Sequence, residues 1–196
     1  KLKFILPPFI LLFIFSAHTF SQEIDFESYS SRYSVTASHL NPAEELEFGL
    51  ILVNEGLRTI PIADAKIITI EGIKYLDVTV EIIADEYLLL NGDLGCVTNA
   101  SCRIAFNLEA AYTNRGPENI NHANLMTTAG NSALARFPIE QRGNEPPGPP
   151  PTPVYEGYDL AAQMRTAYLY IYGSINVGNI DAGIYSANIT VNISYD

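Results

Sequence analysis

The chain has 196 residues, of which 22 are acidic and 11 are basic, so its formal charge at pH 7 is −11. This charge argues against a nucleic-acid partner, because binding to phosphates is driven by clustered lysine and arginine side chains. The hydrophobic fraction of 47% is that of a folded chain rather than a disordered one, and the length is that of one domain.

The first 21 residues have the layout of a secretory signal peptide. Lys1 and Lys3 precede an apolar run over residues 4–15, and Thr19 and Ser21 are small residues suited to a cleavage site. A membrane anchor is the alternative interpretation, but the run is short for a bilayer span. We therefore expect cleavage after Ser21 and export of the protein.

Short runs with the period of β-strands follow along the chain. Alternating or β-branched residues occupy positions 33–38, 46–53, 65–70, 78–83, 103–108, 166–172 and 184–195. Gly49 inside the second run indicates a bulge, and the Glu71-Gly72 pair is a turn signal. This pattern predicts an all-β fold, an antiparallel β-sandwich or barrel of about seven to eight strands.

Two cysteines, Cys96 and Cys102, lie six positions apart. In an oxidising compartment they can pair and close a small loop. A metal-binding pair is the alternative, but two thiols with no nearby histidine make a poor zinc site. We expect a local disulfide that stabilises the fold by on the order of 2 kcal/mol, because the loop that it closes is short.

Residues 109–160 interrupt the strand pattern. The first part, 109–136, is rich in asparagine and alanine and is compatible with a short helix. Residues 143–153 contain six prolines within eleven positions, and proline cannot donate to a sheet ladder. We interpret 109–160 as an insertion, with an exposed Pro-rich loop, into a single domain that spans residues 39–196 and follows an N-terminal extension at 22–38.

The last strand has the clearest pattern in the sequence. Its strict alternation over residues 184–195 is typical of a half-buried antiparallel strand. The residues on its apolar face are Tyr185, Ala187, Ile189, Val191, Ile193 and Tyr195.

The sequence carries no enzyme signature. His39 and His122 stand in no metal-ligand spacing, and no phosphate-binding loop, dinucleotide fingerprint or serine elbow is present. The paired acids at Asp85-Glu86 are typical of a solvated charge cluster, because neighbouring residues of a strand point to opposite faces. We expect no catalytic residues, no metal and no cofactor.

The C-terminal residues resemble the signature of spore-coat-protein-U-like and related fimbrial-type domains. In those domains an aromatic-Gly strand precedes a terminal strand of the form Gly-x-Tyr-x-Gly-x-x-x-Val-x-Val-x-Tyr. The matching positions here are Tyr172, Gly173, Gly183, Tyr185, Val191, Ile193 and Tyr195, and Leu46-Glu47-Phe48-Gly49 resembles the Leu-x-Phe-Gly strand near the start of the family. Ala187 departs from the pattern, because glycine is usual at that position.

This resemblance implies an immunoglobulin-like, pilin-like sandwich that lacks one strand. In such a protein a periplasmic chaperone, and then the N-terminal extension of the next subunit, adds the missing strand. The resemblance implies Tyr185, Ile189, Val191, Ile193 and Tyr195 as the acceptor strand, and Ile24, Phe26, Tyr33, Val35 and Ala37 as donor side chains. The implied partners are copies of itself or sister subunits, the periplasmic chaperone and an outer-membrane usher. The implied route runs through the periplasm to the cell surface or the medium.

A second hypothesis is a self-complete monomeric sandwich that binds a glycan or another surface ligand. It is based on Tyr168, Tyr170 and Tyr172, which share one strand face and have rings that can stack on sugars. The competing interpretation is that these rings pack against the 109–160 insertion.

Overall fold

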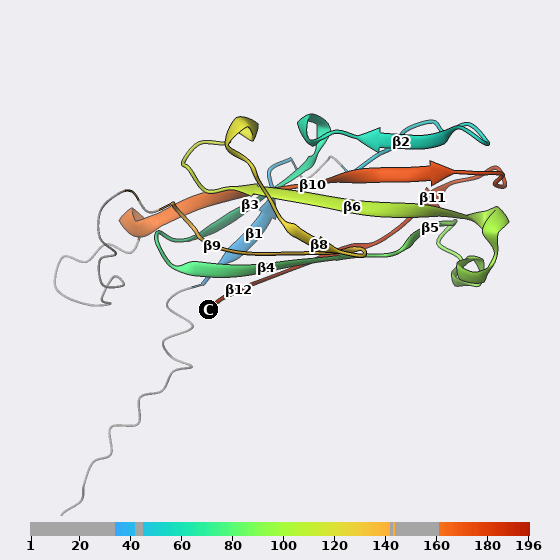
Figure 1. Ribbon diagram of the computed structural model, residues 1–196. Coiled ribbons are helices and arrows are strands. Elements are labelled where there is room, and N and C mark those ends of the chain that lie inside the picture. The colour runs from blue at the N-terminus through green and yellow to red at the C-terminus, as the bar shows by residue number, and fades with distance from the viewer. Residues whose placement is uncertain (1–33, 42–44, 142, 144–160) are drawn as a thin grey trace, which may run out of the picture. The chain divides into compact units, whose positions relative to one another are not determined.

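The computed structural model describes residues 34–41, 45–141, 143 and 161–196, and this part of the chain is built from antiparallel β-strands (Figure 1). The predicted signal peptide at 1–21, most of the N-terminal extension and the Pro-rich stretch from residue 144 onward lie outside the described residues.

Eight strands form the larger sheet. They are β1 (Thr36–His39), β2 (Gly56–Ile60), β3 (Lys66–Ile73), β5 (Tyr87–Leu90), β6 (Arg103–Thr113), β7 (Asn124–Leu125), β10 (Met164–Val177) and β11 (Tyr185–Ser186). The strand order is β1-β3-β10-β6-β5-β11, with β2 also paired to β10 and β7 to β6. The 14-residue strand β10 is central, because it pairs with β2 and β3 along one edge and with β6 along the other.

Four strands form the smaller sheet. They are β4 (Asp77–Ala84), β8 (Thr127–Ala129), β9 (Ser132–Pro138) and β12 (Ile189–Tyr195), in the order β12-β4-β9-β8. Figure 1 shows this sheet lying against the larger one. Strand β4 alternates as its sequence predicts, with Val78, Val80 and Ile82 fully buried between the sheets.

The two-sheet architecture confirms the predicted all-β sandwich. The described part of the chain has twelve strands, more than the expected seven to eight. One reason is that the chain along one edge of β10 is divided into two separate strands. Strands β2 and β3 run one after the other along β10, and the one-turn helix η1 (Ile62–Asp64) separates them.

The described helices are short 3-10 helices of three to five residues, and no α-helix occurs in the described ranges. They are η1, η2 (Leu94–Thr98), η3 (Ala100–Cys102), η4 (Ile120–His122) and η5 (Ala161–Gln163). None of these described helices has the length and apolar character needed to cross a bilayer.

The described part of the 109–160 segment contributes strands to both sheets. The end of β6 and all of β7 belong to the larger sheet, whereas β8 and β9 belong to the smaller one. The short helix expected here is limited to the single turn η4. Polar groups of this segment also connect the sheets, since the Asn131 side chain donates to the carbonyl oxygens of Asp85 and Phe106, at 2.8 and 2.9 Å.

Candidate functional site

Strand β12 lies at the edge of the smaller sheet. It pairs with β4 over its whole length, from Ile189 opposite Ala84 to Tyr195 opposite Val78. Along its other edge no strand is paired within the described residues. An edge of this kind presents main-chain N–H and C=O groups that another strand can pair with.

Within the described part of the chain, the core is incompletely covered beside β12. The apolar face of β12 points toward the same core as β4, yet Ile189, Val191 and Ile193 are only partly buried. On β4, by contrast, Val78, Val80 and Ile82 have no exposed surface. The apolar side of β12 therefore still offers surface that a further strand would bury, and burial of apolar surface is favourable.

Tyr195 connects the last strand with the first described residues. The Ile73 amide donates to the Tyr195 phenol oxygen at 2.7 Å, and the phenol donates to the Ser34 carbonyl at 3.4 Å. Gly72 permits this approach, because a Cβ at that position would lie 2.6 Å from the phenol oxygen. Burial raises the pKa of Tyr195, although the hydrogen bond from Ile73 acts in the opposite direction.

Residues 45–51 join neither sheet as a strand, and the chain bends at Leu50 after Gly49, whose φ is +69°. Their side chains alternate at first, with Leu46 partly buried and Phe48 buried, and Phe48 packs edge-on against Phe106 with ring centroids 6.2 Å apart. The sequence predicts a strand here, but a strand needs a partner for its ladder. In the described structure this segment and β12 both pack on one core, and each has a main-chain edge outside the ladders.

The predicted donor residues are divided between described and undescribed parts of the chain. Ile24, Phe26 and Tyr33 lie outside the described residues. Val35 is partly buried against the core, whereas Ala37 is exposed in β1 and pairs with Ile70 of its own chain. The end of the predicted donor segment therefore forms an edge strand within its own sandwich.

The predicted acceptor residues do not share one strand. Tyr185 belongs to β11 and pairs with Leu90 in the larger sheet, whereas the other four belong to β12. The expected continuous strand breaks at residues 187–188, because the Asp85 carboxylate accepts bonds from the Asn188 amide and side chain, at 2.8 and 3.1 Å. These bonds hold the chain where it passes from one sheet to the other.

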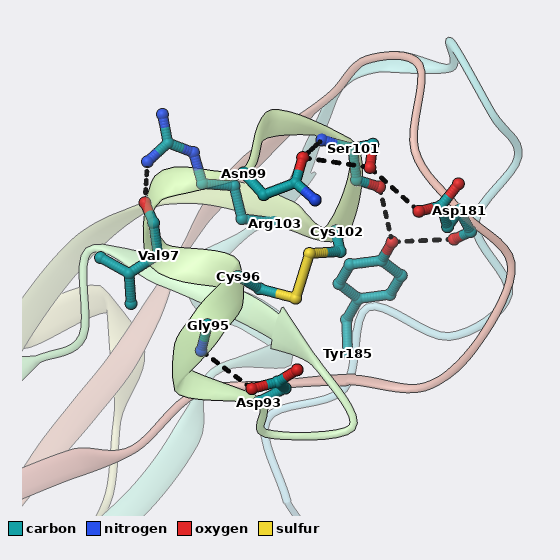
Figure 2. The surroundings of a disulfide bond; sticks show 10 residues. All are labelled: Asp93, Gly95, Cys96, Val97, Asn99, Ser101, Cys102, Arg103, Asp181 and Tyr185. Atoms are coloured by element: carbon teal, nitrogen blue, oxygen red, sulfur yellow. Dashed lines mark hydrogen bonds between the residues drawn. A yellow bond between two sulfur atoms is a disulfide. The ribbon is translucent and has the colours of Figure 1, made fainter.

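Cys96 and Cys102 form the predicted disulfide, and both half-cystines are buried. Figure 2 shows the loop that they close, with Ser101 directed toward Asp181. The Tyr185 phenol donates to the Asp181 carbonyl at 2.8 Å and to the Ser101 carbonyl at 3.4 Å. The disulfide loop is thereby joined to the segment that precedes β11.

The three tyrosines on β10 do not form one open face. Tyr170 and Tyr172 are buried, and only Tyr168 is partly exposed. The Tyr170 phenol donates to a Glu118 carboxylate oxygen at 2.7 Å, so a residue of the 109–160 segment covers it. This contact agrees with the interpretation that Tyr170 packs against the 109–160 segment. Of the three rings in the predicted ligand face, Tyr168 is then the accessible one.

Alkaline solution is expected to destabilise this fold through four buried or partly buried tyrosines. Burial is the main cause that raises the pKa of each of them: Tyr170, Tyr172, Tyr185 and Tyr195. In the unfolded chain these phenols ionise near pH 10, whereas in the folded chain they keep their protons to higher pH. Above about pH 10, unfolding therefore releases protons from these phenols. The free energy of unfolding is unaffected by the phenols below about pH 10 and falls as the pH rises above it.

Urea unfolding at intervals from pH 8 to 11.5 measures this effect. The variant Tyr170→Phe removes one titrating group and is expected to show a shallower alkaline decline than the parent protein. Identical slopes for parent and variant would contradict a raised pKa at Tyr170.

The two histidines that the structure describes lie in different elements. His39 lies in β1 and His122 in η4. In the ranges that the structure describes, no group of three or more His, Cys, Asp or Glu side chains is arranged to hold a metal ion.

No protein-family model matches this chain, and no curated protein matches it. Among solved structures, it is similar to a chain of one described as "Chaperone-tip adhesin complex is vital for synergistic activation of CFA/I fimbriae biogenesis". The identity is 13% and the TM-score 0.36, and the match covers 84% of this chain and 42% of that chain. The present chain thus spans less than half of its length, and so distant a likeness assigns neither family nor function.

Proposed function

We propose that this protein is a structural subunit of an exported surface filament, assembled by addition of a strand along β12. The observation that carries the proposal is that β12 is paired along one edge and only partly buried. Its outer edge has no paired strand in the described part of the chain, and its apolar side chains are only partly buried. An added strand would pair with this edge and bury the apolar row at the same time.

The donor in this proposal is the chain that precedes β1, from residue 24 onward. It carries Ile24 and Phe26, followed after a polar stretch by Tyr33, whereas Val35 packs on the core of its own subunit. Alternate apolar side chains can enter the gap beside β12, while the main chain pairs with the strand edge.

A subunit with such an edge needs protection before assembly. An unpaired strand beside exposed apolar surface is a site of uncontrolled pairing between copies. We therefore propose a periplasmic chaperone as the first partner, an outer-membrane usher as the second, and other copies or sister subunits as the final ones. The role is structural and not enzymatic.

Deletion of residues 22–30 tests the proposal. The shortened protein is expected to lose its polymers, because the donor is missing, and to remain a folded monomer bound to its chaperone, because the acceptor is intact. Surface extracts and periplasmic fractions are compared by electrophoresis in SDS before and after boiling. Strand-exchanged polymers give ladders that collapse only on boiling, and unchanged ladders from the shortened protein would contradict the proposal.

A further inference from the structure

A shallow pocket of about 240 Å³ lies where β10 begins. It is on the second face of the larger sheet, because Thr166 and Tyr168 alternate with the core residues Ala167 and Leu169. Besides these two residues, its lining includes Gly116, Pro117, Glu140 and Arg165.

The segments that supply the walls of this pocket are held by partly buried hydrogen bonds. The side chain of Asn114, which is buried, donates to the Pro138 carbonyl at 2.7 Å, and the Gln141 amide donates to the Asn114 carbonyl at 2.8 Å. These bonds join the chain that leaves β6 to the chain that leaves β9. The Tyr170–Glu118 bond holds the same loop against β10. The pocket is therefore formed before any ligand arrives.

A carboxylate and a guanidinium group meet at this pocket. The Arg165 Nε atom lies 3.3 Å from a Glu140 carboxylate oxygen, and the two side chains are 41% and 30% exposed. Arg165 also donates to the carbonyl oxygens of Ala162 and Met164, at 3.1 and 2.7 Å. These contacts orient the guanidinium group, while the exposed parts of both side chains remain available as donors and acceptors.

We propose that this pocket binds a neutral sugar ring. The hydroxyl groups of a sugar both donate and accept, which suits a neighbouring carboxylate and guanidinium, and its apolar C–H face can pack on the Tyr168 ring. An anionic ligand fits less well, because Glu140 already neutralises Arg165 and the whole chain carries a charge of −11. The volume is below the range of about 300–1,000 Å³ typical of drug-sized ligands, so it suits a single ring.

This site is separate from the edge of β12. Its lining comes from the larger sheet and from the loops around it, whereas β12 belongs to the smaller sheet. Failure of strand addition would leave the sugar proposal unaffected, and failure of sugar binding would leave strand addition unaffected.

Titration with the methyl glycosides of glucose, galactose, mannose and N-acetylglucosamine tests the proposal by saturation-transfer NMR. At least one sugar is expected to bind the parent protein, with a dissociation constant on the order of 1 mM. Arg165→Ala and Glu140→Gln are each expected to weaken that binding by about tenfold or more, since each removes a charged hydrogen-bonding group. Tyr168→Leu keeps an apolar side chain but removes the ring, and it is expected to weaken binding as well.

Arg136→Ala is the matched control. Arg136 is an exposed arginine of β9, in the smaller sheet, and it pairs with Asp77 and Asp196. It is expected to leave sugar binding unchanged. Thermal unfolding identifies any variant that fails to fold. If Arg165→Ala or Tyr168→Leu fails to fold, the sugar affinity of the near-isosteric Glu140→Gln tests the proposal. No binding by the parent protein, unchanged binding by Glu140→Gln, or an equal loss in Arg136→Ala would overturn the proposal.

Discussion

Alanine at position 173 is expected to prevent stable folding. Gly173 lies in the central strand β10 with a φ of +157°, and a Cβ there would overlap the main-chain oxygen of Asn107 on β6. Main chain cannot move aside as a flexible side chain can, so the ladder between the two longest strands would have to separate locally. We expect a loss of about 4 kcal/mol or more, a large share of the roughly 5–15 kcal/mol that stabilises a typical domain.

Gly178→Ala is the matched control for this prediction. Gly178 follows the end of β10, and a Cβ there would meet no atom within 4 Å. Its substitution is expected to change the free energy of unfolding by no more than about 0.5 kcal/mol. Urea unfolding followed by circular dichroism compares the two variants with the parent protein. An equal midpoint for Gly173→Ala and the parent would show that β10 and β6 are not packed as described.

Aspartate at position 191 is expected to abolish polymers. Val191 stands in the middle of the partly buried apolar row of β12. An added strand would cover position 191, and a carboxylate buried there without a partner costs several kcal/mol, enough to lower assembly by a factor of a hundred or more. In the monomer the same carboxylate can still reach water, so folding is expected to suffer less than assembly.

Thr190→Asp places the same charge on the neighbouring, outward-facing position of β12, where the side chain is exposed. It is expected to leave polymers in place. The measurement is the SDS-resistant ladder of unboiled surface extracts, together with the thermal midpoint of each purified monomer. Ladders that persist in Val191→Asp, or that vanish equally in both variants, would show that the apolar row of β12 is not the assembly surface.

Local patterns were sufficient to predict several parts of the fold. The alternation of residues 189–195 predicts which side of β12 faces the core, because successive side chains of a strand point to opposite faces. The disulfide is similarly local, since a loop between Cys96 and Cys102 is short enough to close without help from the rest of the chain. These features depend on neighbours in the sequence.

Other features depend on residues far apart in the chain. The break before β12 results from Asp85, which lies 103 positions before its partner Asn188, and no periodicity reports such a contact. Covering of the Tyr170 phenol depends in the same way on Glu118, 52 positions before it. Alternation predicts that the three rings share one face of β10, but it cannot show which of them another segment covers. The pocket beside Tyr168 was missed for this reason.

The bond between Tyr195 and Ser34 has a mechanical consequence for a filament assembled as proposed. Tension would enter each subunit through the strand added along β12 and leave through the chain before β1. Tyr195 links β12 directly to Ser34 and to Ile73 of β3, so the load path crosses one end of the sandwich. The disulfide loop lies beyond β5, near the opposite end (Figure 1), and would carry little of that load. Resistance to pulling would therefore depend on this phenol together with two ladders, that of β12 with β4 and the short one of β1 with β3.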